Sequence, residues 1–344
     1  MDIGDFDYEL PADRIAQRPL PERDASRLML LPRRTGAPEH RSVRELPELL
    51  LPGDLLVVNR SRVFPARLLG RRAGGGEAEV LLLARRGPDE WDALVRPGRR
   101  LRTGDTVRVG DELTLSVASG PLGRDGRRRV RLEASGVGAD EAIARLGRLP
   151  LPPYIRRPDD AADRERYQTV YAREAGSVAA PTAGLHFSDA LLARLAARGV
   201  GRAELVLHVG PGTFRPVTAD RVEEHRLEAE PFWIPPETAQ AIASVRAAGG
   251  RVVAVGTTTV RALESAADSQ GQVAAGPGET DLVILPGFGF RVVDALLTNF
   301  HLPRSSLLLL VAAFAGRARV LDAYAEAVRA GYRFYSYGDA MLVK

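Results

Sequence analysis

Two short segments combine residues that can do acid–base chemistry with residues that shape loops. Residues 179–187 read Ala-Ala-Pro-Thr-Ala-Gly-Leu-His-Phe, and residues 208–216 read His-Val-Gly-Pro-Gly-Thr-Phe-Arg-Pro. Glycine lets the backbone approach a ligand, proline stiffens a loop, and an imidazole can transfer a proton near neutral pH. Because the chain has only five histidines, we predict that His186 and His208 are catalytic and share one cleft; the alternative is a pair of structural histidines.

A third segment has the pattern of a ligand-binding turn. Residues 251–261 run from an apolar strand through Gly256 and three threonines, Thr257, Thr258 and Thr259, into a helix that carries Arg261. A strand-to-helix turn of this kind lies at the carboxyl edge of a sheet, where its free N–H groups suit a carboxylate, ribose or phosphate. The alternative is that a threonine only caps the helix. No Gly-Lys-Ser/Thr follows, so the segment is not a Walker loop.

Other polar groups stand in breaks between apolar runs. Asn299 and His301 lie in the segment 297–303, and Tyr337 and Asp339 lie in the apolar tail 333–342. We expect this tail to dock on the body; the alternative is a plain edge strand. Residues 59–67 mix amide, guanidinium and aromatic groups that can hold a base and its phosphate. The predicted RNA contacts there are Asn59, Arg62, Phe64 and Arg67.

The elements that must position these groups fall into two patterns. Short strands separated by Gly-rich breaks fill residues 52–134 and favour a small antiparallel barrel. Helices and strands then alternate, which indicates a layered α/β domain. Helices are expected at 139–147, 163–174, 188–198, 236–248, 258–267, 305–315 and 318–330, and strands at 200–209, 251–256 and 281–285. We therefore predict an α/β catalytic domain of residues 1–60 and 151–344, with an inserted β-barrel domain of residues 61–150.

Composition excludes several classes of function. The chain has no cysteine, so disulfides, thiolate nucleophiles and cysteine metal sites are absent. The histidine spacing fits no zinc motif, and Gly-x-Ser-x-Gly is missing.

From Arg60 to Ala134 there are 17 arginines and 10 acidic residues, a surplus of seven positive charges in a chain of net charge +4. Such a basic block indicates a polyanion, unless it reflects only the arginine-rich composition.

The apolar runs and the first residues bear on localisation. The longest apolar run, within 304–315, is too short to cross a bilayer, and the acidic start Met-Asp-Ile-Gly-Asp is not that of a signal peptide. We expect a cytoplasmic protein that does not associate with membranes, and a monomer.

Taken together, the segments resemble one known family. The resembling motifs are Phe6-Asp-Tyr-Glu-Leu-Pro11, residues 59–67, Leu149-Pro-Leu-Pro-Pro-Tyr-Ile155, Tyr167-Gln-Thr-Val-Tyr171, residues 179–187, residues 208–214, Gly256-Thr-Thr-Thr-Val-Arg261, Thr298-Asn-Phe-His-Leu-Pro303 and Phe334-Tyr-Ser-Tyr-Gly-Asp-Ala340. In this order they are similar to the S-adenosylmethionine:tRNA ribosyltransferase-isomerases of queuosine synthesis. The likeness runs from end to end and is weakest over residues 70–148.

The resemblance implies a reaction without a metal or other cofactor. The ribosyl part of S-adenosylmethionine, the donor substrate, moves onto 7-aminomethyl-7-deazaguanine at the tRNA wobble position and is isomerised to an epoxycyclopentanediol, while adenine and methionine leave. The partners are thus this tRNA and S-adenosylmethionine. The family is described as an α/β catalytic domain with an inserted barrel.

The demands of that reaction assign expected roles. The base that removes a C5′ proton beside the sulfonium is His186 or His208, and the other histidine or Thr213 protonates adenine. Asn299 or Asp339 accepts from ribose hydroxyls, aromatic faces such as Phe187, Phe214 and Tyr337 favour the sulfonium, and the 256–259 turn with Arg261 holds the methionine carboxylate. The other residues predicted to bind substrate are Thr182, Gly184, Gly210, Gly212 and His301.

Two rival functions stay open at this point. An S-adenosylmethionine-dependent RNA methyltransferase would release S-adenosylhomocysteine, but the first strand, Leu55–Asn59, runs into Arg-Ser-Arg rather than a Gly-rich loop. A non-catalytic RNA-binding module would bind RNA regardless of both histidines, and it leaves the two histidine loops unexplained.

Overall fold

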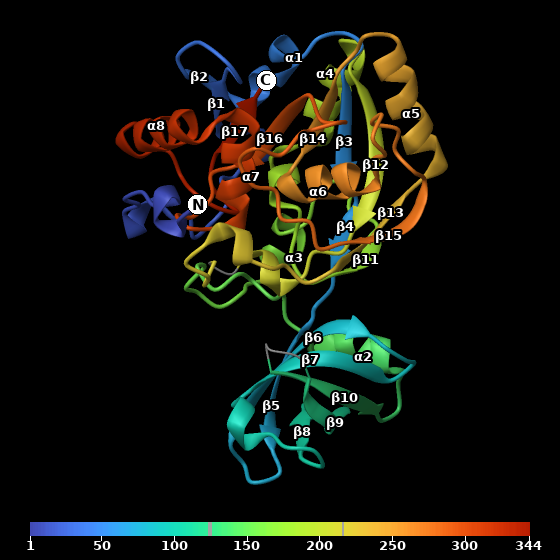
Figure 1. Cartoon of the computed structure of the whole chain (residues 1–344). Coiled ribbons are helices and arrows are strands. Elements are labelled where there is room, and N and C mark those ends of the chain that lie inside the picture. The colour runs from blue at the N-terminus through green and yellow to red at the C-terminus, as the bar shows by residue number, and fades with distance from the viewer. Residues whose placement is uncertain (123–125, 215–216) are drawn as a thin grey trace.

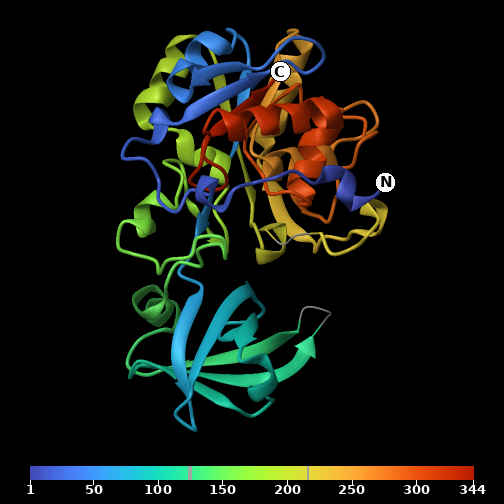
Figure 2. The same ribbon diagram turned by 90° about the vertical axis from the view of Figure 1, so that its left-hand side faces the viewer.

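The protein has an α/β body and a closed β-barrel. The computed structural model describes residues 1–122, 126–214 and 217–344. The barrel lies at one end of the body, and the chain passes between them twice, once before the barrel strands and once after the barrel helix (Figure 1). The same division is visible after a quarter turn (Figure 2). The predicted fold class, a layered α/β domain with an antiparallel barrel, is confirmed.

The described part of the body is built on a nine-stranded mixed sheet. Its central strands are parallel, and the outer strands are mostly antiparallel. The strand order is β15 (Gly276–Thr280), β13 (Glu230–Ile234), β12 (Gly201–Leu207), β3 (Leu55–Asn59), β14 (Val252–Val255), β16 (Ala295–Asn299), β17 (Ala340–Val343), β1 (Arg27–Leu31) and β2 (Glu39–Ser42).

Helices cover both faces of this sheet because its central strands are apolar on both sides. In β3, Leu55 and Val57 pack into one cluster and Leu56 and Val58 into the other, as the two-residue period of a strand requires. The first cluster includes residues of α5 (Pro236–Ala247), α6 (Thr257–Ala266), α7 (Ser306–Ala315) and α8 (Arg317–Arg329). The second includes residues of α1 (Leu46–Leu49) and α4 (Asp189–Ala197), whose first turn is capped by Ser188 as predicted.

The barrel is closed by antiparallel pairs and has its own apolar core. Its order is β10 (Arg127–Ala134), β7 (Glu90–Arg96), β6 (Glu77–Arg85), β5 (Arg67–Arg72), β8 (Thr106–Val109) and β9 (Leu113–Leu122), and β9 pairs with β10 to close it. Alternate residues such as Val80, Leu82 and Val117 point inward. Helix α2 (Ala139–Leu146) packs on the barrel through Ala142 and Ile143, and it has no side-chain cap from Asp140.

The sequence-based element assignments fail at two places. No strand forms at 281–285; the strand of this region, β15, comes earlier and ends at Thr280. The helix expected at 163–174 is shorter, because α3 spans only Asp163–Arg166. Residues 174–177 instead form β11 (Glu174–Ser177), a parallel partner of β4 (Ser61–Val63). Around Pro65 the chain forms two strands, β4 and β5 (Arg67–Arg72), with a break between them, because proline has no N–H for a ladder. The 333–342 tail does dock, as a central rather than an edge strand.

No helix in the described ranges is long and apolar enough to cross a membrane. The most apolar helix, α7, has only ten residues and is buried in the body.

Candidate functional site

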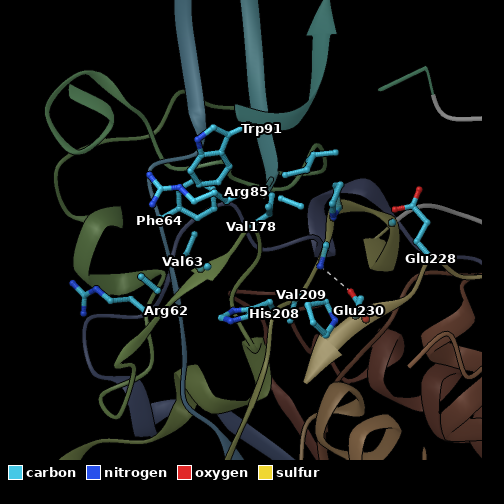
Figure 3. Close-up of a pocket in the computed structure, with 18 of the residues that line it drawn as sticks. Arg62, Val63, Phe64, Arg85, Trp91, Val178, His208, Val209, Glu228 and Glu230 are labelled. Atoms are coloured by element: carbon cyan, nitrogen blue, oxygen red, sulfur yellow. Dashed lines mark hydrogen bonds between the residues drawn. The ribbon is translucent and has the colours of Figure 1, made fainter. Parts of the chain in front are cut away.

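The candidate site is a cavity of about 800 Å³ between the barrel and the body. Barrel strands and α2 line one side, and the chain around β11, the end of β12 and the start of β13 line the other (Figure 3). A volume of this size is in the range that holds nucleotide-sized ligands. The cavity therefore has room for a small substrate and part of a larger one.

His208 is the histidine that faces this cavity. It directly follows β12, and its backbone N–H donates to Pro231 O at 3.0 Å. The ring rests on Gly176, where a Cβ would lie 2.8 Å from the imidazole and where φ is +141°. The side chain is half-buried, and burial lowers its pKa, opposed by the charge of Glu174. The imidazole is therefore neutral near pH 7 and able to accept a proton.

The glycines after His208 line the same cavity. Gly210 donates its N–H to Glu230 Oε1 at 2.7 Å, and Gly212 follows in a short 3-10 helix. The side chains of Thr213 and Phe214 lie outside the described part of the structure, so their predicted roles stay predictions.

Arg261 has a structural role in the described part of the chain. Its guanidinium pairs with Glu230 and donates to Leu282 O at 2.9 Å and to Thr280 O at 3.1 Å. Arg261 is 2% exposed and anchors α6 to the outer strands rather than facing a ligand. The consequence for the site is that the Glu230 carboxylate, which lines the cavity, is held in place by Arg261 and Gly210.

The barrel side of the cavity is basic and aromatic. Phe64, a predicted RNA contact, lines it, whereas Arg62, also predicted, lines the cavity from β4, the partner of β11. Phe64 packs on Trp91, with ring centroids 5.4 Å apart, and the Arg85 guanidinium lies 5.1 Å from the Trp91 ring centroid. Arg86 and Arg127 also line this side.

His186 does not share the cavity with His208, so the prediction of one common cleft is wrong. His186 ends the 3-10 helix Thr182–His186, is 3% exposed and lines a separate void of about 20 Å³. Its Nε2 accepts from Asn299 Nδ2 at 3.2 Å, and Asn299 Oδ1 accepts from the Thr182 hydroxyl at 2.9 Å. Burial, reinforced by Arg333 and Arg23, lowers the His186 pKa to about 4.

The threonine turn borders a second small void, next to His301. Gly256, Thr257 and Thr258 line about 30 Å³, room for one water but not for a methionine carboxylate. His301 lies on the same void, where Thr298 Oγ1 is 2.8 Å from its Nε2 and burial lowers its pKa to about 3. Thr259 is fully buried and donates to Val255 O at 2.7 Å. The void is smaller than a carboxylate needs in the structure as it stands, and the role of this turn in binding the carboxylate stays a prediction.

Two other predicted RNA contacts have structural roles. Asn59 is fully buried: its amide donates to Leu207 O at 2.9 Å and accepts from Ser61 N at 3.0 Å and Leu207 N at 3.1 Å. Arg67 donates to Leu151 O at 3.4 Å and exchanges backbone hydrogen bonds with Arg148, which joins the two chain crossings. Both residues take part in the connection to the barrel.

Three predicted substrate contacts are also structural. Phe187 is fully buried in the cluster under α4. At Gly184 a Cβ would collide with Tyr171, so glycine serves close packing there. The Asp339 carboxylate accepts from the backbone N–H groups of Arg27 at 3.0 Å and Arg333 at 2.8 Å. It does not line the His208 cavity or the voids beside His186 and the threonine turn.

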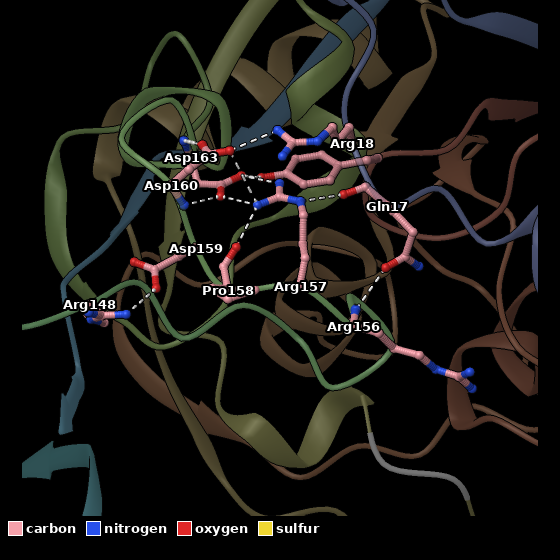
Figure 4. A network of polar contacts seen from close by, with 10 residues as sticks. Gln17, Arg18, Arg148, Arg156, Arg157, Pro158, Asp159, Asp160 and Asp163 are labelled. Atoms are coloured by element: carbon pink, nitrogen blue, oxygen red, sulfur yellow. Dashed lines mark hydrogen bonds and ion pairs between the residues drawn. The ribbon is translucent and has the colours of Figure 1, made fainter.

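Tyr337 belongs to a polar network that fixes the chain returning from the barrel. Its hydroxyl donates to Asp163 Oδ1 at 2.8 Å, and Arg157 pairs with the same carboxylate at 2.6 and 2.7 Å. Arg157 also donates to the backbone of Gln17, so the network joins segments far apart in the sequence (Figure 4). The edge of the Tyr337 side chain lines the small void beside His186, not the large cavity.

Sequence reasoning missed several residues of the large cavity: Arg85, Arg86, Trp91, Arg127, Gly176, Glu228 and Glu230. Trp91 is one of only two tryptophans in the chain, which was a usable signal. Glu228 and Glu230 stand in an ordinary charged stretch that nothing local distinguishes. Within the described ranges, no group of three histidine, aspartate or glutamate side chains is placed to hold a metal ion.

Comparison with known proteins identifies the family. A family model described as "Queuosine biosynthesis protein" matches residues 3–343. The chain is 55% identical to the S-adenosylmethionine:tRNA ribosyltransferase-isomerase of Anaeromyxobacter sp. (strain Fw109-5) over 100% of this chain and 99% of that protein. It is 53% identical to the enzyme of that name from Symbiobacterium thermophilum over the full length of both.

A solved structure agrees with this result. The crystal structure of the S-adenosylmethionine tRNA ribosyltransferase from Thermotoga maritima is 42% identical in sequence, with a TM-score of 0.57, and the match covers 99% of this chain and 100% of that one. The resemblance drawn from the motifs is confirmed: this chain belongs to the queuosine biosynthesis protein family.

Proposed function

We propose that the protein is an S-adenosylmethionine:tRNA ribosyltransferase-isomerase. It transfers the ribosyl part of S-adenosylmethionine to 7-aminomethyl-7-deazaguanine in the tRNA anticodon and isomerises it, and adenine and methionine leave. The product is epoxyqueuosine-tRNA. Family membership over the whole chain and the shared name of the relatives support this proposal.

One observation carries the proposal at the level of the site. A single cavity has a neutral imidazole and carboxylates on the body side and arginines with aromatic rings on the barrel side. S-adenosylmethionine carries a sulfonium and an ammonium group, whereas tRNA is a polyanion. The two walls thus suit the two substrates, and His208 lies on the body wall.

We assign proton abstraction to His208. The sulfonium acidifies the adjacent C5′–H bond; the bond breaks, the proton passes to the imidazole, and the electron pair stays on C5′ beside the positive sulfur. His208 suits this step because it is uncharged near neutral pH and faces the cavity. His186 is enclosed, and we assign it a positioning role through Asn299.

The carboxylates of Glu228 and Glu230 complete the donor side. Glu230 is nearly buried and is oriented by Arg261 and Gly210, so its position is fixed before substrate arrives. A fixed carboxylate near a developing or existing cation stabilises it without reorganisation. We propose that this pair of acids binds the cationic part of S-adenosylmethionine.

We further propose that residues 1–60 and 151–344 form the catalytic domain and that residues 61–150 form an inserted domain that binds tRNA. Residues 60–134 carry a surplus of seven positive charges, more than the net +4 of the whole chain. Arginine contacts to phosphate supply affinity that falls with salt.

The test is product analysis. The protein is incubated with S-adenosylmethionine and tRNA that carries the deazaguanine precursor, and the nucleosides and small molecules are identified by mass spectrometry. We expect epoxyqueuosine together with free adenine and methionine in equal amounts. Formation of S-adenosylhomocysteine and a methylated nucleoside, or binding without any product, would overturn the proposal.

A further inference from the structure

The barrel wall of the cavity carries a pair of aromatic rings. Trp91 lies on β7 and is 8% exposed, and Phe64 lies in the connector between β4 and β5. Their planes are tilted by 32°, with centroids 5.4 Å apart. Figure 3 shows this pair at the barrel end of the cavity and His208 at the body end. We call Phe64 and Trp91 the ring pair.

Positive charge surrounds the ring pair. The Arg85 guanidinium lies over Trp91 at 5.1 Å, and Arg62 and Arg127 line the same cavity. The charges of the opposite wall are those of Glu228, Glu230 and Glu279, with His208 between them. Asp140 of α2 also lines the barrel side, where it pairs with Arg85. The other carboxylates of the cavity lie across from the rings.

Aromatic rings flanked by arginines are the usual way in which proteins hold an unstacked base of single-stranded nucleic acid. The adenine of S-adenosylmethionine could also stack on such rings, but its sulfonium and ammonium groups would then lie next to the arginines, which is unfavourable. A base in an RNA loop brings phosphates instead, which the arginines attract.

We propose that the ring pair is the stacking platform for the substrate base of the anticodon loop, with the neighbouring arginines on the adjoining phosphates. The inference rests on the proposed function and assigns a specific role to Trp91. The base enters from the barrel side, so its reactive aminomethyl group points toward His208 and the donor substrate on the body wall.

The ion pairs of the free protein are compatible with this role. Arg85 pairs with Asp140 and Arg127 pairs with Glu228, and each of these pairs has at least one side chain well exposed. Exposed pairs of this kind contribute little, so a phosphate can replace the carboxylate at small cost. When Arg127 moves to a phosphate, the Glu228 carboxylate is released for the cationic donor substrate.

A binding experiment tests the platform without turnover. The chain has two tryptophans, so Trp233→Phe leaves Trp91 as the only indole fluorophore. Trp233 lies on β13 and is 37% exposed, outside the residues that line the cavity. This variant is titrated with an anticodon stem-loop RNA carrying the deazaguanine precursor, with the same RNA abasic at that position, and with S-adenosylmethionine alone.

We expect saturable quenching of Trp91 emission by the precursor RNA and at least fivefold less quenching by the abasic RNA or by S-adenosylmethionine. Fluorescence anisotropy of labelled RNA confirms binding in parallel. Equal quenching by the abasic RNA, quenching by S-adenosylmethionine alone, or RNA binding without quenching would each overturn the platform.

Kinetics provide the second test and separate a platform from a structural tryptophan. Trp91→Leu removes the stacking face, and we expect KM for tRNA to rise on the order of 10-fold or more, with KM for S-adenosylmethionine within twofold. Trp91→Phe keeps a ring and should restore KM to within about threefold of wild type. Trp233→Leu is the matched control and should leave both KM values unchanged.

The two proposals fail differently. If no epoxyqueuosine forms but Trp91 is quenched only by the precursor RNA, the platform stands and the reaction is wrong. If epoxyqueuosine forms and a folded Trp91→Leu protein keeps the wild-type KM for tRNA, the reaction stands and the platform is wrong. Thermal unfolding of Trp91→Leu and Trp91→Phe shows whether the barrel is folded.

Discussion

The loops around His186 and His208 have similar neighbours in the sequence but opposite environments in the structure. Both combine a histidine with proline, glycine and threonine. His208 rests on Gly176 and faces a cavity of about 800 Å³, whereas His186 is 3% exposed and hydrogen-bonded to Asn299. Local residue types therefore predict a loop of defined shape, but the packing around that loop decides whether the imidazole can contact substrate.

Burial explains the different tasks. The void beside His186 is about 20 Å³, so no substrate group larger than one water molecule fits there. The ring orients Asn299 and Thr182 instead. The half-buried His208 keeps access to the cavity, and its pKa is lowered without the ring being sealed. The four predictions below test this contrast, in order of decreasing effect.

The largest effect is expected from removing the base. His208→Gln keeps a side chain of similar size but cannot take a proton, so kcat should fall on the order of 10²–10⁴-fold. His186→Gln is the matched variant and should keep kcat within about tenfold for the folded protein. Both are measured as epoxyqueuosine formed per minute at saturating substrates. A fall confined to the His186 variant would reverse the assignment.

His186 should contribute to the pH dependence of stability, in addition to His301, whose pKa burial lowers to about 3. The His186 pKa is about 4 in the folded protein and near 6.5 in an unfolded chain, so the unfolded state binds the extra proton first. The contribution of neutral His186 to the free energy of unfolding is complete above pH 6.5 and is lost as the pH falls through 4. The loss amounts to at most about 3 kcal/mol.

Urea unfolding at several pH values checks this slope. The decline between pH 6.5 and 4 should be shallower in His186→Gln than in wild type, while His208→Gln serves as the control. Equal slopes in wild type and His186→Gln would show that the ring is not sealed in the neutral form.

The two glycines beside these loops should respond differently to alanine. Gly176→Ala places a Cβ 2.8 Å from the His208 ring at a φ of +141°, so the ring must move and kcat should fall on the order of tenfold. Gly184→Ala collides with Tyr171 in the core and should lower the free energy of unfolding by about 1–3 kcal/mol. A Gly176 variant with unchanged kcat would show that the ring position does not matter.

The smallest effect concerns the network around Asn299. Thr182→Val removes the hydroxyl that donates to Asn299 Oδ1 and should cost about 1 kcal/mol of stability. Thr182→Ser keeps the donor and is the control. Equal stabilities of the valine and serine variants, measured by urea unfolding, would contradict a structural role for this hydrogen bond.

The sequence predicted the architecture well because its signals are local. Gly-rich breaks marked the barrel strands, and apolar runs before capped helices marked the sheet, as at Ser188. The errors arose where distant partners decide: Gly276–Thr280 is a strand because it pairs with β13, and Glu174–Ser177 because it pairs with β4.

The site was predicted only in part, for a physical reason. His208, Gly210, Gly212, Arg62 and Phe64 line the cavity as their loop and aromatic patterns indicated. The ion pair of Arg261 was not predicted because its partner, Glu230, lies 31 residues away in the sequence, and this pairing depends on the order of the strands. Trp91 and Glu228 lie on opposite walls that only the insertion of the barrel brings together.

Release of tritium from 5′-tritiated S-adenosylmethionine into water, in the presence of precursor tRNA, tests the role of His208 most directly. The account predicts that wild type and His186→Gln release tritium and that His208→Gln does not, although all three bind the RNA equally. Release by His208→Gln at the wild-type rate would contradict it.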